Sequence, residues 1–264
     1  GEEFTLVENE FGDILQTIPV PSLIKISEYY KSENYISHTD TKKSFTDKVY
    51  HFIKNIALKQ KVSLISKINK GSGKLLDIGS GTGDFLATAK QKNWAVFGVE
   101  PNPDAITLSE KKGIGVSKDL KDIIETDFDV ITLWHVLEHV PDVEDYICEI
   151  SKRLKASGTL IVAVPNFKSK DAQHYKQFWA AYDVPRHLWH FSKTGIQRLF
   201  SKNQFEFIIS KPMWFDAFYV SLLSEKYKTG KTNWLKAIFR GLQSNLSGLQ
   251  TKEYSSHIYI LKKK

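Results

Sequence analysis

Cysteine and methionine are almost absent: the 264 residues include one cysteine, Cys148, and one methionine, Met213. A single thiol excludes an internal disulfide and a zinc site built from several cysteines. Long apolar runs are also missing, because no window approaches the roughly 18 uninterrupted apolar residues of a membrane-spanning helix. We therefore expect a protein without a membrane span, located in the reducing cytoplasm.

Acidic residues are fewer than basic ones, and 37 Lys and Arg against 30 Asp and Glu leave a formal net charge of +7. Such a balance can indicate a nucleic-acid-binding protein. The lysines are scattered, however, and the run at residues 262–264 is too short for an RNA-binding arm. We interpret the charge as a solvated basic surface and expect no nucleic-acid partner.

Apolar residues make up 41% of the chain, which is enough for a substantial core. Four short, near-continuous apolar runs predict strands buried on both faces: residues 75–78, 94–99, 129–133 and 160–164. Three stretches between them are predicted to be helical: residues 84–92, 103–112 and 143–155. Alternating strands and helices form a parallel sheet with helices on both sides. We expect an α/β fold, doubly wound and Rossmann-like.

The flanks of this core have different patterns. Residues 1–40 lack clear periodicity, so we predict an N-terminal arm. A predicted helix over residues 41–70 begins the domain that fills residues 41–264. After the core, residues 205–210 and 257–261 are predicted strands, separated by an unusually long excursion.

The first predicted strand is joined to the first helix by a glycine-rich turn, Asp77 to Gly83, with the sequence D-I-G-S-G-T-G. Glycine permits positive backbone angles and close approach of a ligand, and a helix N-terminus offers free N–H groups to an anion. A dinucleotide-binding turn has the spacing G-x-G-x-x-G. Here the third glycine comes one residue early and Asp84 takes its place, so the turn indicates a different cofactor.

Glu100 ends the second predicted strand, 21 residues after Gly79. A carboxylate at that place can accept hydrogen bonds from both hydroxyls of an adenosine ribose. The alternative is a structural cap at the strand end. Because the glycine-rich turn lies upstream, we favour the ribose role.

Together, D-x-G-x-G-x-G and the acidic strand end resemble the class I S-adenosylmethionine-dependent methyltransferases over about residues 41–211. The resemblance implies a seven-stranded sheet that ends in an antiparallel hairpin. It also implies S-adenosylmethionine as the cofactor and S-adenosylhomocysteine as its product. It assigns cofactor contacts to the following residues: Asp77, Gly79, Ser80, Gly81, Gly83, Glu100, Pro101, Asn102, Asp119, Leu120 and His135.

Residues 134–142 have the sequence W-H-V-L-E-H-V-P-D and resemble a stretch of the ubiquinone-type O-methyltransferases. Loops at the carboxyl ends of parallel strands bind ligands in such sheets. His135 is therefore expected to face the methionine end of the cofactor. The alternative is structural, with Glu138 and His139 capping a helix or lining a wall.

A second cluster, residues 182–192 with the sequence Y-D-V-P-R-H-L-W-H-F-S, resembles a group of bacterial methyltransferases. Its aromatic, arginine and histidine side chains suit a polar acceptor pocket. The alternative is a packed loop that leads into a helix capped by Ser192. A hydroxyl acceptor benefits from a base, so the candidate catalytic residues are His135, His187 and His190.

Members of this bacterial group often carry an N-terminal zinc ribbon, with V-x-C-x-x-C followed by P-x-P. This sequence has Val7 and Pro19-Val20-Pro21 in matching positions, but Asn9 and Gly12 stand where the cysteines would be. We interpret the arm, residues 1–40, as a degenerate zinc-ribbon remnant that binds no zinc.

These patterns predict a methyltransferase that modifies a small-molecule acceptor, with oxygen as the expected acceptor atom. Two alternatives stay open. One is an RNA 2′-O-methyltransferase, whose metal-binding E-x-x-E-H pattern is echoed by His135, Glu138 and His139, and the other is a non-catalytic cofactor-binding scaffold. We favour a metal-free pocket in which one histidine acts as the base. The aromatic-rich residues 213–249 predict a helical insertion that either caps the acceptor pocket or forms a homodimer contact.

Overall fold

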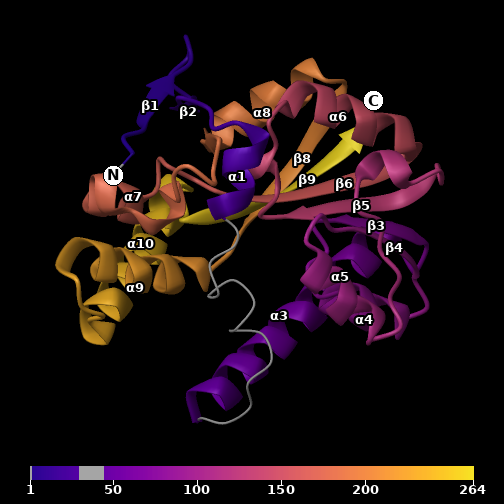
Figure 1. The fold of residues 1–264 in the computed structure, drawn as a ribbon, viewed down its shortest axis with the longest axis horizontal. Coiled ribbons are helices and arrows are strands. Elements are labelled where there is room, and N and C mark those ends of the chain that lie inside the picture. Colours follow the sequence, from indigo (N-terminus) through magenta and orange to yellow (C-terminus); the bar gives the residue numbers. More distant parts are fainter. Residues whose placement is uncertain (1, 30–44) are drawn as a thin grey trace. The chain divides into compact units, whose positions relative to one another are not determined.

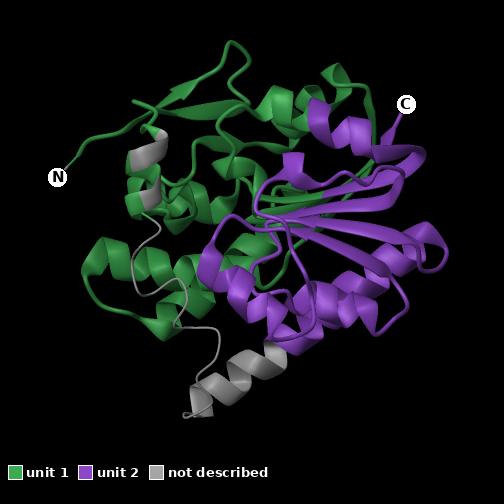
Figure 2. Cartoon of the chain, turned by 45° about the vertical axis from the view of Figure 1, so that its right-hand side comes forward, with its two compact units in different colours: residues 1–29, 135–147, 162–261 green, residues 30–134, 148–161, 262–264 purple. Residues whose placement is uncertain are grey.

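The computed structural model describes residues 2–29 and 45–264. Residues 30–44 lie outside the described residues, and with them the end of the predicted arm and the start of the predicted helix over 41–70. The chain divides into two compact units, shown in Figure 2. Unit 1 contains Gly1–Tyr29, His135–Ile147 and Val162–Leu261, and unit 2 contains Tyr30–Trp134, Cys148–Ile161 and Lys262–Lys264.

A six-stranded sheet is the main element of the fold (Figure 1). Its strands follow the order β4-β3-β5-β6-β9-β8, and β3 pairs in parallel with both β4 and β5. The strands are β3 (Lys74–Ile78), β4 (Ala95–Val99), β5 (Phe128–Trp134), β6 (Leu154–Pro165), β8 (Phe205–Pro212) and β9 (Ser256–Lys263). The α/β, Rossmann-like prediction is confirmed.

The predicted strand number, seven, is wrong for the described part of the chain, where this sheet has six strands. Past β4, Ser117 forms only an isolated parallel bridge with Val99. Its backbone donates to Gly98 O and accepts from Glu100 N–H, both at 2.9 Å. Asp119 then caps a 3-10 helix, η1 (Leu120–Asp122), so the segment turns away after one bridge. It is too short to extend into a strand.

In unit 2, helices alternate with the strands as the sequence predicts. They are α3 (Phe45–Asn69), α4 (Asp84–Lys90) and α5 (Pro103–Glu110). Asn102 starts α5, because its side chain accepts hydrogen bonds from two backbone N–H groups and Pro103 occupies the first turn. The fully buried Leu75, Leu76 and Ile131 of β3 and β5 form the centre of this core.

Unit 1 contains a second, three-stranded sheet that the sequence did not reveal. Its order is β1 (Thr5–Glu8), β2 (Ile14–Ile18) and β7 (Trp189–Phe191). The β1–β2 hairpin therefore pairs with the segment that contains His190, 172 positions beyond the end of β2. Strands of three to five residues have too little alternation for recognition by pattern. The sequence predicts an N-terminal arm over residues 1–40 without assigning strands to it, and the structure adds these two strands to its described part.

The remaining helices of unit 1 are short, except for the last two. They are α1 (Leu23–Tyr29), α6 (Val143–Arg153, which continues into unit 2), α7 (Lys170–Tyr175), α8 (Lys193–Lys202), α9 (Asp216–Thr229) and α10 (Trp234–Thr251), with single-turn 3-10 helices at 137–139, 176–178 and 180–182. In the described residues, no helix is both long and apolar enough to cross a bilayer.

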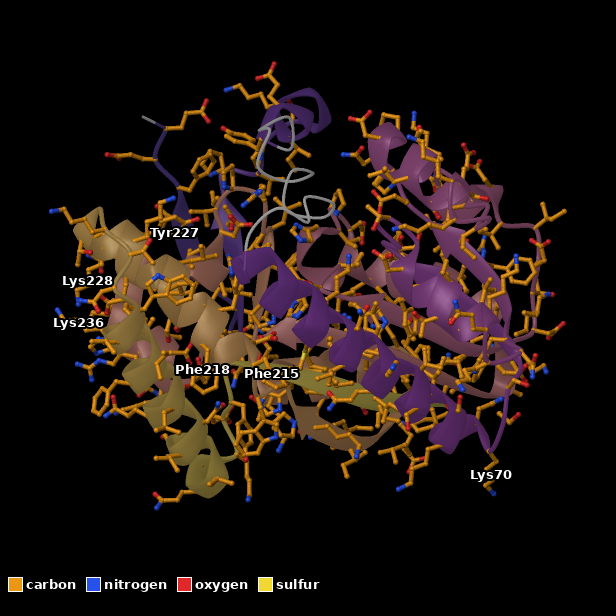
Figure 3. The ribbon with its side chains drawn as sticks, turned by 90° about the horizontal axis from the view of Figure 1, so that it is seen from below. Lys70, Phe215, Phe218, Tyr227, Lys228 and Lys236 are labelled. Atoms are coloured by element: carbon orange, nitrogen blue, oxygen red, sulfur yellow. The ribbon has the colours of Figure 1, made fainter. Side chains whose placement is uncertain are left out.

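Helices α9 and α10 confirm that the predicted insertion at residues 213–249 is helical. Apolar residues on α10 recur at helical spacing, yet each is 48% exposed or more: Leu235, Ile238, Phe239, Leu242, Leu246 and Leu249. Lys228 and Lys236 line the same surface pocket and lie near each other in Figure 3. An apolar stripe of this kind on a helix is normally covered, which keeps the cap and dimer predictions for this segment open.

Asp171, at the start of α7, joins three separate segments of unit 1. Its carboxylate is 1% exposed and accepts hydrogen bonds from Trp179 Nε1 at 2.8 Å, Ser244 Oγ at 2.6 Å and Ser255 Oγ at 2.7 Å. Ser244 lies on α10 and Ser255 directly precedes β9. One buried carboxylate thus fixes the insertion and the last strand to the loop after β6.

Candidate functional site

The glycine-rich turn of unit 2 follows β3 and is held against β4. Gly79 N–H and Ser80 N–H both donate to Val99 O, at 2.8 and 2.9 Å. Gly79, Gly81 and Gly83 have φ values of +70°, +53° and +75°, a region that favours glycine. A Cβ on Gly81 would meet nothing within 4 Å, so this side of the turn is open to a ligand.

The third glycine of the turn, Gly83, stands one residue earlier than in a dinucleotide-binding turn, and its packing explains why. A Cβ at this position would lie 2.3 Å from Ser109 Oγ on α5, which leaves no room for a side chain. Asp84, at the place where a dinucleotide turn has its glycine, forms ion pairs with Lys54 and Lys112 at 2.8 and 2.7 Å. Burial opposes ionisation of Asp84, but hydrogen bonds from Lys112 and Lys54 outweigh it and lower its pKa.

Asp77 is a buried carboxylate at the end of β3. It is 2% exposed, and its Oδ1 accepts a hydrogen bond from Thr132 Oγ1 at 2.6 Å. Burial raises the pKa of Asp77 to about 7, against the smaller lowering effects of Thr132 and Lys61. A cationic ligand beside this group would favour the ionised form, which fits the predicted contact with the methionine portion of the cofactor.

Glu100 binds the glycine-rich turn directly. Its Oε2 accepts from Gly81 N–H at 2.8 Å and its Oε1 accepts from Asn102 N–H at 2.9 Å. Burial raises its pKa, although both backbone hydrogen bonds lower it. Glu100 therefore has the structural role that the sequence left open as an alternative. Each carboxylate oxygen retains a second lone pair, so the predicted ribose role is compatible with these bonds.

The other predicted cofactor residues of unit 2 also have local structural roles. Asn102 caps α5 and Pro101 precedes it. Asp119 Oδ1 accepts from Lys121 N–H at 2.9 Å, and Leu120 is 3% exposed. The hydrogen bonds of Ser117 with Gly98 and Glu100 hold its segment beside the end of β4. The contact of these predicted residues with the cofactor stays a prediction.

Replacing Glu100 with alanine is expected to weaken binding of S-adenosylhomocysteine about 10- to 100-fold, because hydrogen bonds to a charged group contribute about 1.5–3 kcal/mol. Isothermal titration calorimetry measures this loss. Asp104→Ala is the matched control, because Asp104 is an exposed acid in the first turn of α5. Equal affinities of the Glu100 variant and the unmodified protein would remove Glu100 from the cofactor site.

His135 follows β5 and is the first residue of the polar cluster in unit 1. Its φ of +58° is unusual for a residue with a side chain, and its N–H donates to Ala163 O at 2.9 Å. The ring lies between two carboxylates, with Nδ1 3.3 Å from Glu138 Oε1 and Nε2 3.2 Å from Asp216 Oδ2. The sequence gave no signal for Asp216, which begins α9.

The charge on His135 follows from these two partners. Burial would lower the pKa of His135, but Asp216 and Glu138 outweigh it and raise the value to about 10. Its side chain is 34% exposed, so solvent screens the pairs in part. At neutral pH the ring is therefore a hydrogen-bond donor, which argues against His135 as the base in the ligand-free protein.

Glu138 lies deeper than His135 and is 1% exposed. Burial opposes its ionisation, yet His135 lowers the pKa of Glu138 to about 2. Its second oxygen, Oε2, is buried and has no hydrogen-bond partner among the described residues. A buried carboxylate oxygen without a partner is costly, so a further ligand for this atom is to be expected.

Hydrogen bonds join the two polar motifs found in the sequence. They connect residues 138–140 of the first motif with residues 186–189 of the second. Leu188 N–H donates to Glu138 O at 2.8 Å, and Trp189 Nε1 donates to Val140 O at 2.9 Å. His139 Nδ1 lies 3.0 Å from Arg186 O. The structure thus brings Glu138 and His139 next to His187, with the rings of the two histidines 4.5 Å apart between centroids.

His139 and His187 are oriented in the same way. Nδ1 of His187 contacts Ala181 O at 2.9 Å, as Nδ1 of His139 contacts Arg186 O. A carbonyl oxygen only accepts, so each Nδ1 carries the proton and Nε2 is the basic atom of the neutral ring. Burial lowers the pKa of His187, and burial with the neighbouring His187 lowers that of His139 to about 4.

His190 has a different environment from the other candidate catalytic histidines. Its Nε2 lies 3.0 Å from Thr17 Oγ1, which donates to His187 O at 2.7 Å. It is 4% exposed, and burial lowers its pKa to about 3. These contacts join β7 to β2, so His190 has a structural role in the small sheet. Ser192 accepts from Gly195 N–H, which confirms the predicted cap of α8.

Asn9 and Gly12 stand where a zinc ribbon has cysteines, and the side chain of Asn9 closes the turn that they form. Asn9 Oδ1 accepts from Asp13 N–H at 3.1 Å and Ile14 N–H at 3.3 Å, and its Nδ2 donates to Asp13 Oδ1 at 2.9 Å. Gly12 has a φ of +62°. Asparagine and glycine at these positions therefore form the turn with hydrogen bonds to the backbone.

Comparisons with known proteins agree with this fold. A family described as "Methyltransferase domain" matches residues 51–210, more than half of the chain. A ubiquinone biosynthesis O-methyltransferase of Paramagnetospirillum magneticum is 30% identical over 104 residues, which cover 36% of this chain and 42% of that protein. The mitochondrial protein of the same description from Schizosaccharomyces pombe is 27% identical over 129 residues, 44% of this chain and 47% of its own length. The matches thus span less than half of these relatives.

Solved structures show the same fold at lower identity. Magnesium protoporphyrin IX methyltransferase from Synechocystis PCC 6803, with bound S-adenosylhomocysteine, has a TM-score of 0.60 at 14% identity, covering 92% of this chain and all of that one. A possible histamine N-methyltransferase from Thermotoga maritima has a TM-score of 0.55 at 20% identity, covering 83% and 96%. The chain therefore belongs to the class I S-adenosylmethionine-dependent methyltransferases, with S-adenosylmethionine as its cofactor.

Proposed function

We propose that this methyltransferase transfers the methyl group to an oxygen of a small-molecule acceptor, and that the cluster of Glu138, His139 and His187 binds that acceptor. The observation that carries the proposal is a pair of neighbouring imidazoles, each with its Nδ1 against a backbone carbonyl oxygen, that lie in one polar cluster with the buried Glu138. The O-methyltransferase descriptions of the matched relatives support oxygen as the acceptor atom.

The reaction requires little from the protein beyond position and proton removal. As the C–O bond forms, the C–S bond of the sulfonium breaks, and the hydroxyl proton has to leave. Holding the two reactants together accounts for much of the rate in such displacements. A neutral imidazole can accept the proton, and the protonated His135 can donate a hydrogen bond to another oxygen of the acceptor.

A turnover screen tests this proposal. The protein is incubated with S-adenosylmethionine and with catechols, phenols, sugars, small amines or short RNAs, and S-adenosylhomocysteine release is measured. Mass spectrometry then locates the added methyl group. An O-methylated small molecule supports the proposal. Methylation confined to nitrogen or carbon would contradict it, and methylation of RNA alone would favour the alternative acceptor class.

Helix α9 supports the cap role that the sequence predicts for residues 213–249. Its first residue, Asp216, contacts His135, and Ser224 Oγ accepts from Ala180 N–H at 2.9 Å. The exposed apolar face of α10 supports the dimer role equally well. Sedimentation analysis with and without S-adenosylhomocysteine separates the two roles, because only the dimer contact gives a species of twice the mass.

A further inference from the structure

We propose that α9 and α10 bind the surface of a membrane that contains anionic phospholipids, without crossing it. In this arrangement the apolar face of α10 enters the boundary between headgroups and acyl chains, and a cationic pocket beside it takes a phosphate headgroup. Such binding goes beyond methyl transfer and does not depend on the acceptor. The apolar face consists of six side chains that are 48% to 82% exposed: Leu235, Ile238, Phe239, Leu242, Leu246 and Leu249.

The packing of α10 explains why its large apolar side chains point outward. A Cβ on Gly241 would lie 2.6 Å from Phe218 Cδ1, and a Cβ on Gly248 would lie 2.5 Å from Tyr254 Cδ1. Larger residues therefore do not fit on the side of α10 that packs against the rest of unit 1. The residues buried on that side are small or polar: Ala237, Gly241, Ser244, Asn245 and Gly248.

Two buried hydrogen bonds fix the rotation of α10 about its axis. Ser244 Oγ donates to Asp171 Oδ1 at 2.6 Å, and Asn245 Nδ2 donates to Trp214 O at 2.9 Å. A rotation that turned the apolar face inward would break both bonds and leave buried polar groups without partners. The exposed apolar face is therefore a fixed feature of this fold.

The charge around this face has one sign. Residues 226–252 contain six lysine and arginine residues and no aspartate or glutamate. No ion pair in the described part of the chain includes any of the six. A helix with large apolar residues on one face and cations beside them is typical of binding to an anionic membrane surface. The six cations are Lys226, Lys228, Lys231, Lys236, Arg240 and Lys252.

A surface pocket of about 370 Å³ joins the cations to the apolar face. Lys228, Lys236 and Arg240 line it, and the first two lie near each other in Figure 3. Leu235 and Phe239 of the apolar face line the same pocket. A phosphate headgroup in this pocket would thus meet three cations, while its acyl chains lie against the apolar face.

The other polar groups of the pocket leave its potential positive. Burial lowers the pKa of His174, and Arg240 and Lys228 lower it further, against the opposing effect of Glu225. Glu225 is 4% exposed, and its Oε1 accepts a hydrogen bond from Tyr175 Oη at 3.1 Å. The positive charges therefore outweigh this acid, and the pocket suits an anion.

Charge also favours a lipid surface over a second copy of the chain. A symmetric dimer places the same patch on both copies, so this cationic face would meet itself, and facing like charges are costly. Lysine is depleted in interfaces between proteins. Tyr227 and Trp234 are 53% and 61% exposed, and such aromatic side chains favour the level of the headgroups.

Vesicle sedimentation tests the proposal with the full chain. The protein is mixed with vesicles of phosphatidylcholine alone or of phosphatidylcholine with phosphatidylglycerol. We expect binding to the mixed vesicles at least about tenfold tighter than to the neutral ones, because each nearby cation contributes about fivefold at an anionic surface. This preference should decrease as salt is added.

Paired substitutions test the pocket. Lys228→Gln with Lys236→Gln is expected to weaken binding to the mixed vesicles about 30-fold. The control, Lys70→Gln with Lys92→Gln, removes the same charge from exposed positions of unit 2 and should bind as the unmodified protein does. Equal losses in the two paired variants would show that net charge alone causes the binding, and would overturn the pocket.

The apolar face is tested in the same way. Leu235→Ser with Phe239→Ser is expected to weaken vesicle binding at least about 30-fold, because two large side chains no longer enter the bilayer. Ile124→Ser is the control, since Ile124 is an apolar residue of unit 2 that is 88% exposed. Circular dichroism and S-adenosylhomocysteine binding show that the variants are folded. Unchanged vesicle binding in the folded double variant would overturn the role of the face.

Fluorescence locates the contact independently of affinity. Vesicles with phosphatidylglycerol should shift the tryptophan emission to shorter wavelength, and Trp234→Phe should remove most of this shift while vesicle binding continues. A shift that persists in this variant would place the contact elsewhere. Sedimentation that shows a dimer, together with no vesicle binding, would assign the apolar face to a second copy and overturn the proposal.

Discussion

Replacing Asp77 with asparagine is expected to stabilise the ligand-free protein at pH 8 by about 4 kcal/mol, because burial raises the pKa of this carboxyl to about 7 from an unfolded value of about 3.9. Ionising the buried group costs free energy only in the folded state. Asparagine has no such cost, and its side-chain oxygen can still accept from Thr132 Oγ1.

The sign of the pH dependence follows from the raised value. Below about pH 4 the carboxyl is protonated in both states and contributes no difference between them. Between about pH 4 and 7 the folded state binds more protons than the unfolded state, so the free energy of unfolding of the unmodified protein falls as pH rises. Above about pH 7 Asp77 is ionised in both states, and the free energy of unfolding falls no further on account of this group. Denaturant unfolding at pH 5, 6, 7 and 8 should show the advantage of the variant growing with pH. A difference that is constant with pH would contradict this account.

The same substitution is expected to weaken cofactor binding about tenfold or more, because the cationic cofactor loses a carboxylate partner. Greater stability with weaker binding is the combination that a merely structural carboxylate would not produce. Thr132→Val is the matched control, since it removes the hydroxyl that lowers the pKa of Asp77. That variant should be less stable than the unmodified protein, most of all above pH 7.

Replacing Asp171 with alanine is expected to lower the free energy of unfolding by about 4 kcal/mol or more. Three buried donors lose a charged acceptor at once, and hydrogen bonds to charged groups contribute about 1.5–3 kcal/mol each. The loss should loosen α10 in particular, because Ser244 is its direct link to Asp171. Urea unfolding measures the total, and hydrogen exchange locates it.

The control for Asp171 is Asp145→Ala, on the exposed surface of α6. A surface acid in a first helical turn should change the free energy of unfolding by no more than about 1 kcal/mol. Equal effects of the two substitutions would show that the Asp171 network does not hold α10 in place.

Apolar runs predict the central strands well, because a strand buried on both faces must be apolar throughout. The ends of β3, β4 and β5 fall within one residue of the predicted ends. Strand β6 is the exception, since it begins at Leu154, where the prediction has a helix that continues to residue 155. Its first half has the sequence L-K-A-S-G-T, which lacks an apolar run, and pairing with neighbouring strands determines its conformation.

The sequence predicts the two motifs of the candidate site separately. It does not predict that the two motifs lie next to each other in the structure. Residues 134–142 and 182–192 each contain a suggestive set of polar side chains, and neither predicts the hydrogen bonds that join them. His190 has the same sequence context as His187, yet its partner is Thr17 on β2. The β1–β2 hairpin holds His190 away from the polar cluster and leaves His187 in it. The pattern of the sequence does not reveal this hairpin.

The sequence by itself determined the family, the cofactor and the place of the glycine-rich turn, because these depend on local spacing. Positive φ at Gly79, Gly81 and Gly83, and a carboxylate at the end of the next strand, are properties of short segments. The tertiary structure alone decided the protonation of His135 and the partners of Glu138. Asp216 and His187 lie 81 and 49 positions away from these residues along the chain, and a pKa is set by neighbours in space rather than in sequence.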